Sequence, residues 1–199
     1  MFAAHYGSTA IVRALLAAKA PCDEVLPSDN SPLWIRPVEQ GYADVVGVLL
    51  DAKVDVHSLD ARGRTIAGVA AVRGHTAVLD VLLRAKADVD AGDVVHGFSP
   101  LLLATVEGHA GTVRRLLTAK ANAHACFPGA GWSALTYAAG AGHVGVVRAM
   151  VEFAPELCRM RTSMAHREWD RHFPAGSLPI EVASAMERND VVNVLAERL

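Results

Sequence analysis

The chain has 199 residues, of which 52% are hydrophobic, so it has ample apolar surface for a continuous core. Its 19 lysines and arginines nearly balance its 21 aspartates and glutamates, and the net charge is −2. A charge so close to zero provides no overall field that would attract nucleic acid or an anionic membrane, and we expect neither as a partner.

The cysteines and the hydropathy of the chain indicate a protein of a reducing compartment. Cys22, Cys126 and Cys158 are widely spaced and form no CxxC pair, so neither a disulfide framework nor a zinc site is indicated. The N-terminus lacks a basic segment followed by an unbroken apolar run, and no window approaches the roughly 18 apolar residues of a membrane helix. We therefore expect a cytoplasmic protein without membrane insertion, with the nucleus as the alternative location.

A period of about 34 residues organises the chain. Glycines recur at steps of 34, 33, 34 and 34, at positions Gly7, Gly41, Gly74, Gly108 and Gly142. An aliphatic residue follows each glycine five positions later, from Val12 in the first copy to Val147 in the fifth. Such regularity predicts a repeat protein in which each unit contacts only its neighbours.

Each copy predicts two short helices. The first copy begins inside its own helix, and the next four begin with Ser31-Pro32, Thr65-Ile66, Ser99-Pro100 and Ser133-Ala134. These pairs place a hydroxyl N-cap before a first turn in which proline is tolerated. After the glycine, the second helix carries aliphatic residues such as Val78, Leu79 and Leu82 at the spacing of a buried stripe. The second copy has one extra residue near 35–37, and the last has Glu187 in place of the glycine.

The copies resemble the ankyrin repeat, whose pattern runs T-P-L-H-x-A-A-x-x-G-H, then V-V-x-L-L, then G-A-D. The clearest are RTIAGVAAVRGHTAVLDVLLRAKADV from Arg64 and FSPLLLATVEGHAGTVRRLLTAKANA from Phe98. The resemblance implies an all-α ankyrin-repeat solenoid of stacked helix-turn-helix units with protruding β-hairpin-like loops. The chain then forms a single array 1–199, with a truncated repeat 1–28, repeats 29–61, 62–95, 96–129 and 130–154, an insertion 155–176 and a last repeat 177–199.

Lysine replaces a family glycine after the second helix in four copies, at Lys19, Lys53, Lys86 and Lys120. The resemblance implies a left-handed residue at this position, where a lysine costs up to about 1 kcal/mol in strain. The lysine charge is favourable at the negative end of the helix dipole. We expect a row of lysines along one edge, which is either a solvated row that completes the helix ends or an anion-binding edge.

The insertion PELCRMRTSMAHREWDRHFPAG lengthens the period before the last copy by about 11 residues. Its apolar residues are compatible with a short amphipathic helix that carries Leu157, Met160, Met164, Trp169 and Phe173. The segment is either an enlarged loop packed on the last repeat or a partner-binding appendage, in which Trp169 would contact the partner.

The histidines do not indicate catalysis. Three of them directly follow a repeat glycine, His75, His109 and His143. The family resemblance implies that their rings hydrogen-bond the backbone of the inter-helix turn. His166, Asp170 and His172 lack the spacing of the HExxH type and have two arginines and Glu168 among them. The chain also has no GxGxxG after a strand, no GxxxxGK[ST] and no GxSxG motif. We therefore expect no enzyme activity, no metal and no cofactor.

Positions that vary between copies are the candidates for partner contacts, because recurring positions serve the fold. The resemblance implies that the loop tips and the exposed face of the first helices meet the partner. The tips are Asn30, Arg62, Arg64, His96, Phe98 and Trp132, and the helix face offers Tyr6, Arg73 and Glu107. We expect Phe98 and Trp132, equivalent residues of adjacent copies, to be exposed neighbours beside arginine, as in interface hot spots. The alternative is that both rings pack on a neighbouring loop.

The resemblance implies a monomeric scaffold or adaptor module that binds an unidentified partner protein through its concave loop and inner-helix surface. The alternative is a regulatory or targeting segment of a larger enzyme or channel whose chemistry lies outside this chain. The start within a helix favours a longer parent protein, because a repeat without its first cap exposes core.

Overall fold

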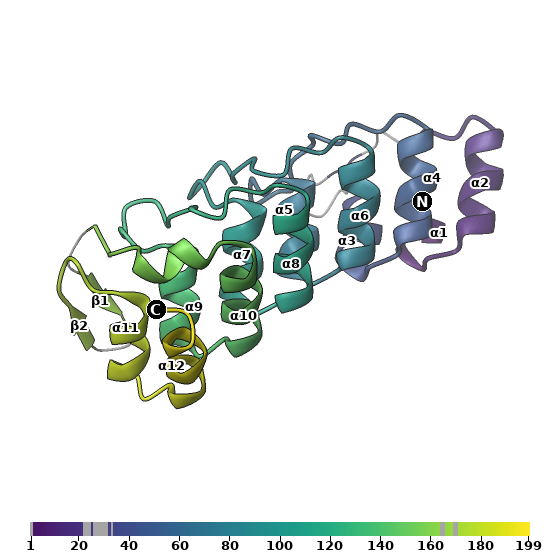
Figure 1. Ribbon diagram of the computed structural model, residues 1–199. Helices are drawn as coiled ribbons and strands as arrows, with labels where there is room; N and C mark the ends of the chain where they lie inside the picture. The colour runs from purple at the N-terminus through teal and green to yellow at the C-terminus, as the bar shows by residue number, and fades with distance from the viewer. Residues whose placement is uncertain (1, 22–24, 26–31, 33, 164–165, 169–170) are drawn as a thin grey trace.

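The computed structural model describes residues 2–21, 25, 32, 34–163, 166–168 and 171–199 (Figure 1). In these residues the helices form pairs that stack side by side, and we call the first helix of each pair inner and the second outer. The inner helices are α1 (Phe2–His5), α3 (Ile35–Gln40), α5 (Ile66–Val72), α7 (Pro100–Val106), α9 (Ala134–Ala141) and α11 (Pro179–Ala185). The outer helices are α2 (Thr9–Ala17), α4 (Ala43–Asp51), α6 (Thr76–Arg84), α8 (Ala110–Thr118), α10 (Val144–Phe153) and α12 (Asn189–Ala196). The expected all-α solenoid is confirmed.

One hydrophobic core runs through the stack, because each inner helix contacts the next inner helix and each outer helix the next outer one. Small residues of the inner helices, such as Ala70 and Ala104, are fully buried and allow the helices to approach closely. Leu82 and Leu116 of the outer helices are buried in the same core. None of the described helices is long and apolar enough to span a membrane.

Hydroxyl N-caps begin three of the inner helices, as the sequence predicts. Thr65, Ser99 and Ser133 accept hydrogen bonds from the backbone N–H three residues later, at 3.1, 3.4 and 3.1 Å. The second copy is different, because α3 begins at Ile35 and not directly after Pro32. Pro37 has no N–H to donate to residue 33, so an α-helix that starts earlier would lack this bond. Ser31 lies outside the described residues.

The inter-helix turns explain the repeated Gly-His pairs. Gly74 has a φ of +71°, and a Cβ there would lie 2.8 Å from the ring of His109. The ring nitrogen Nε2 of His109 donates to the carbonyl oxygen of Val72 at 2.9 Å, so it ties its turn to the preceding repeat. His75 and His143 make the same bond, at 2.9 and 3.1 Å. The structural role expected for these histidines is confirmed.

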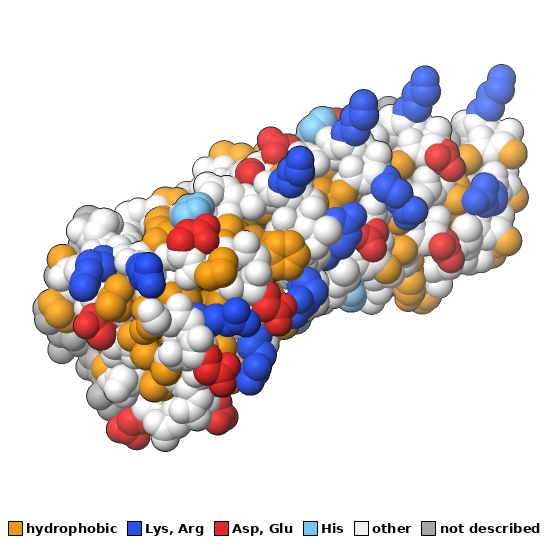
Figure 2. Space-filling view, viewed as in Figure 1, with side chains coloured by type: hydrophobic (Ala, Val, Ile, Leu, Met, Phe, Trp, Pro, Cys, Tyr) orange, Lys and Arg blue, Asp and Glu red, His pale blue; other side chains and the backbone are white. Residues whose placement is uncertain are grey.

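The four lysines end the outer helices in the left-handed conformation, with φ of 59° at Lys19, 63° at Lys53, 66° at Lys86 and 67° at Lys120. Glu187, which replaces the repeat glycine in the last copy, has a φ of 59°. The lysines are exposed, and Figure 2 shows basic side chains following one another along the edge above the outer helices. The left-handed geometry and the row of lysines are therefore confirmed, while anion binding at this edge stays a prediction.

The described residues of the insertion pack on the array and form no α-helix, so the amphipathic helix with which the sequence is compatible is not found among them. They include a 3₁₀ helix, η1 (Pro155–Arg159), and an antiparallel hairpin of β1 (His166–Glu168) and β2 (Arg171–Phe173). Thr162 exchanges backbone hydrogen bonds with Ser177 and Gly176, at 3.0 and 2.8 Å, which holds the segment extended where a helix would need its own bonds. Met164 and Trp169 lie outside the described residues.

Candidate protein-binding surface

Loops that connect an outer helix to the next inner helix project along one edge of the stack (Figure 1). We call residues 54–65 the first finger, 88–99 the second and 122–133 the third. Isolated antiparallel bridges close two of them, Leu59 with Thr65 and Cys126 with Ser133. These hairpin-like loops and the inner helices beside them form the surface that the sequence marks for partner contacts.

The carboxylate of Asp60 organises the first finger and binds Arg64, one of the predicted contact residues. Asp60 accepts hydrogen bonds from the backbone N–H of Arg64 at 2.8 Å and from its Nε at 2.7 Å. The Arg64 Nη2 atom lies 2.6 Å from the same carboxylate, and the side chain is only 15% exposed. Arg64 therefore holds its own finger together, whereas Arg62 at the tip is exposed.

The equivalent carboxylate of the second finger fixes the position of Phe98. Asp93 is buried, and it accepts hydrogen bonds from the backbone N–H groups of Val95, His96 and Phe98 at 3.0, 2.6 and 3.0 Å. The ring of His96 lies 5.3 Å from that of Phe98, and the His96 side chain is 64% exposed. Phe98 is thus held half-buried at the base of an ordered finger.

The third finger has Phe127 where the others have the carboxylate, and this exchange creates an aromatic cluster. The ring of Phe127 meets that of Phe98 edge to face at 5.3 Å, and it lies 5.0 Å from the ring of Tyr137 on α9. An apolar pocket of about 350 Å³ lies between the second and third fingers, lined by Phe98, Val106, Phe127, Pro128, Ala130, Trp132 and Tyr137. We call this the aromatic pocket.

Trp132 is buried, which corrects the expectation of an exposed neighbour of Phe98. Only 2% of the residue is exposed, because the ring of Phe173 from the insertion packs edge to face against it at 5.4 Å. Trp132 still lines the aromatic pocket together with Phe98, so the two residues share one site. The backbone N–H of Ser163 donates to the carbonyl oxygen of Gly131 at 3.0 Å and fixes the insertion to the same finger.

Family comparisons agree with this geometry. The model described as ankyrin repeats (3 copies) matches residues 35–125, and the one described as ankyrin repeats (many copies) matches residues 101–151, so together they cover more than half of the chain. The chain belongs to the ankyrin repeat family. The crystal structure of the human ASB11 ankyrin repeat domain has a TM-score of 0.77 and 21% identity, covering 98% of this chain and 81% of that one. At this identity the likeness shows the fold alone. No curated protein sequence matches the chain significantly.

The remaining predicted contact residues are spread along the ankyrin array. Tyr6 is 73% exposed, but it belongs to the first helix pair, far along the stack from the aromatic pocket. Arg73 and Glu107 are exposed at the C-terminal ends of α5 and α7, and Glu107 follows a residue that lines the pocket. Asn30 and Trp169 lie outside the described residues.

Sequence reasoning missed several residues of this surface. Phe127 and Tyr137 supply two of the pocket's rings, and Val94 and Val95 are 71% and 64% exposed on the second finger. Comparing the fingers would have found Phe127, because an aromatic residue replaces an aspartate at the same distance after the repeat glycine.

A hollow larger than the aromatic pocket lies on the side of the array formed by the outer helices. It measures about 650 Å³ between α2, α4 and α6, and its lining includes Arg13, Asp44, Asp51 and Arg84. Gly47 is part of its lining. The equivalent positions of α8 and α10, at the same distance after the repeat glycine, are Arg114 and Arg148, so the glycine leaves space that a side chain fills in those copies. Mixed charges surround this hollow, so we favour the smaller apolar pocket as the partner site.

The two cysteines among the described residues have no feature of an activated thiol. Cys126 is exposed on the third finger and Cys158 is buried in η1, and both are free thiols. Desolvation raises the pKa of each thiol above its usual value. Within the described residues, no three histidine, cysteine, aspartate or glutamate side chains gather as a metal site. Of the three residues His166, Asp170 and His172, which the sequence disfavours as a metal site, Asp170 lies outside the described residues.

Proposed function

We propose that this chain is a scaffold or adaptor module that holds a partner protein through its fingers and inner helices, with the aromatic pocket as the main contact. The pocket carries the proposal, because an apolar hollow lined by four aromatic rings resembles the interface pockets in which binding energy concentrates. Its volume of about 350 Å³ suits one or two apolar side chains of a partner segment.

The surroundings of the pocket support a protein partner. Exposed Val94 and Val95 extend the apolar surface on the second finger, while His96 and Glu107 provide a polar rim. Aromatic and aliphatic groups inside a polar rim are the usual composition of a protein interface. Nucleic acid would require a concentration of positive charge that this rim lacks.

Replacing Phe98 by alanine tests the proposal. Once affinity capture with the intact array has identified a partner, calorimetry should show affinity reduced at least about tenfold, because Phe98 is half-buried in the pocket wall. Phe153→Ala is the matched control, since Phe153 is 45% exposed on α10 and lies outside the pocket lining. Equal affinity of the Phe98 variant and the parent, with the fold retained, would contradict the proposal.

The alternative proposal is a regulatory or targeting segment of a larger enzyme or channel. The same pocket would then bind another part of the parent protein. Expression of the parent with Phe98→Ala would separate the two, because altered catalysis or conductance without loss of a separate partner favours this alternative. A monomeric state in the cytoplasm or nucleus accompanies both proposals, and the free thiols of Cys126 and Cys158 suit such a reducing location.

A further inference from the structure

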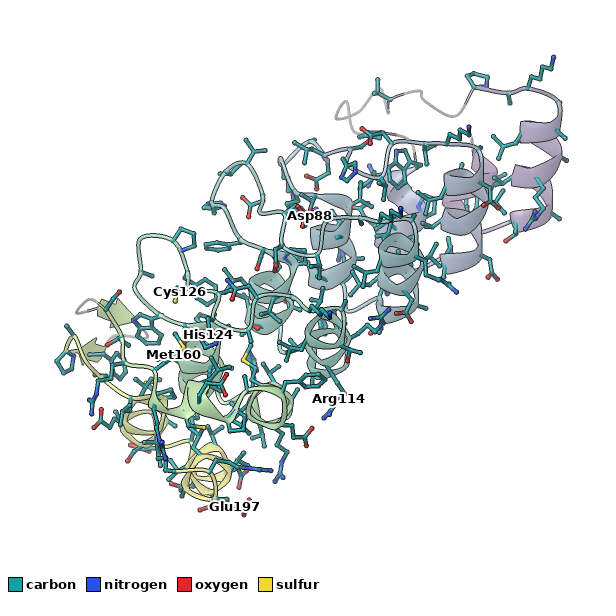
Figure 3. All side chains as sticks on the ribbon, turned by 45° about the horizontal axis from the view of Figure 1, so that its top comes forward. Asp88, Arg114, His124, Cys126, Met160 and Glu197 are labelled. Carbon is teal, nitrogen blue, oxygen red and sulfur yellow. The ribbon has the colours of Figure 1, made fainter. Side chains whose placement is uncertain are left out.

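Three side chains of types that coordinate soft metal ions lie together at the third finger, outside the aromatic pocket. His124 and Cys126 belong to the finger, and Met160 follows η1 of the insertion. The Nδ1 atom of His124 lies 3.3 Å from the Sδ atom of Met160, and the Sγ atom of Cys126 lies 3.4 Å from the carbonyl oxygen of His124. Figure 3 shows the three residues next to one another.

Both sides of this cluster are fixed by the fold. The side chain of Asn122 accepts a hydrogen bond from the backbone N–H of His124 at 3.0 Å, and the bridge between Cys126 and Ser133 closes the finger. His124 lies in a turn, which the backbone N–H of Ala125 closes by donating to the carbonyl oxygen of Asn122 at 3.1 Å. The contact of the Cys126 Sγ atom with the His124 carbonyl oxygen keeps the thiol beside this turn. On the other side, Leu157 is buried, and its carbonyl oxygen accepts from the backbone N–H of Met160 at 3.0 Å.

The separation of the two facing atoms suits ligands of a single ion. Metal–nitrogen bonds of about 2.0 Å and metal–sulfur bonds of about 2.3 Å place the two ligand atoms about 3.5 Å apart at a tetrahedral angle. His124 Nδ1 and Met160 Sδ are 3.3 Å apart, so only small side-chain adjustments are needed. A thioether is a soft ligand, and thiolate together with thioether selects Cu(I) over harder divalent ions.

A carboxylate faces the other nitrogen of the same imidazole. The Nε2 atom of His124 lies 3.6 Å from Oε1 of Glu156, which precedes Met160 by four residues. Histidines that bind metals usually present their second ring nitrogen to a carboxylate, which orients the ring and raises its basicity. The contacts on the two ring nitrogens therefore agree with Nδ1 as the metal-binding atom.

We propose that His124, Cys126 and Met160 bind one Cu(I) ion. The ion arrives already reduced and keeps its charge, and Cys126 binds as the thiolate, so its proton passes to solvent. One thiolate then balances the single positive charge. The remaining finger histidine at this position, His57, has Leu59 where His124 has Cys126, so the first finger lacks the thiol.

Anaerobic titration of the intact protein with Cu(I), in competition with bathocuproine disulfonate, tests the proposal. We expect one ion per chain, and X-ray absorption at the copper edge should show two sulfur neighbours and one nitrogen neighbour. Met160→Leu, His124→Asn and Cys126→Ser should each lower the affinity at least about tenfold, and Glu156→Gln by a similar factor.

Matched variants separate this site from general thiol or imidazole binding. His57→Asn changes a histidine at the equivalent finger position, Met186→Leu changes another partly buried methionine, and Cys22→Ser removes another thiol. All three should keep the affinity of the parent. The proposal is overturned if these controls lose as much affinity as the site variants, or if Met160→Leu binds copper as tightly as the parent. It is also overturned if the protein takes no Cu(I) from the chelator.

Discussion

Replacing the four left-handed lysines by glycine is expected to stabilise the array, although it removes four charges from a favourable place. The φ of these residues lies between 59° and 67°. In this region a side chain costs about 1–2 kcal/mol, which is more than the bound of about 1 kcal/mol set from the sequence alone. Glycine has no such strain but loses about 0.5–1 kcal/mol more backbone entropy on folding. Each lysine charge adds roughly 0.3 kcal/mol at its helix end. The net gain is therefore about 0.5 kcal/mol per site from these magnitudes.

Alanine at the same four positions isolates the backbone contribution, because it removes the charges and keeps the strain. The glycine variant should exceed the alanine variant by roughly 2–4 kcal/mol in the free energy of unfolding, since sites in separate repeats add independently. Urea denaturation followed by circular dichroism and by tryptophan fluorescence measures this difference and checks that unfolding is two-state. An alanine variant as stable as the glycine variant would refute the strain argument.

Three further predictions concern stability. His109→Ala should cost about 1–3 kcal/mol, because the carbonyl oxygen of Val72 loses its donor, and urea denaturation measures the loss. Gly74→Ala should destabilise the array more than Ala77→Gly, a control on the exposed side of α6. A Cβ at Gly74 would contact the His109 ring, and the backbone there is left-handed. The urea midpoints of the two variants measure the difference. Trp132→Ala should lower the free energy of unfolding by about 3–5 kcal/mol and make the insertion more susceptible to proteolysis, because Phe173 loses the ring on which it packs. An insertion that is cleaved no faster than in the parent would contradict this packing role.

The repeat itself could be predicted from the sequence because its features depend on neighbours in the chain or in the next copy. The caps at Thr65, Ser99 and Ser133 act three residues away, and the backbone of Lys86 is fixed by the helix that precedes it. The bond from His109 to Val72 recurs in other copies, so the period reveals it.

The aromatic pocket could not be predicted in the same way, because it depends on contacts between different repeats and the insertion. The repeat pattern indicates Phe98, but the rings that complete its cluster, Phe127 and Tyr137, come from the next finger and the next inner helix. Trp132 occupies the same repeat position as Phe98, yet Phe173 covers it. That ring belongs to a segment without a counterpart elsewhere in the array, so no periodic argument could place it.

Photo-cross-linking tests the central claim of partner binding at the aromatic pocket most directly. A benzophenone amino acid would replace Tyr137 in one variant and Phe153 in another, one residue lining the pocket and the other exposed on the outer helix α10. The account predicts a cross-link to the partner from position 137 and none from position 153. A partner that cross-links from position 153 and not from position 137 would contradict it.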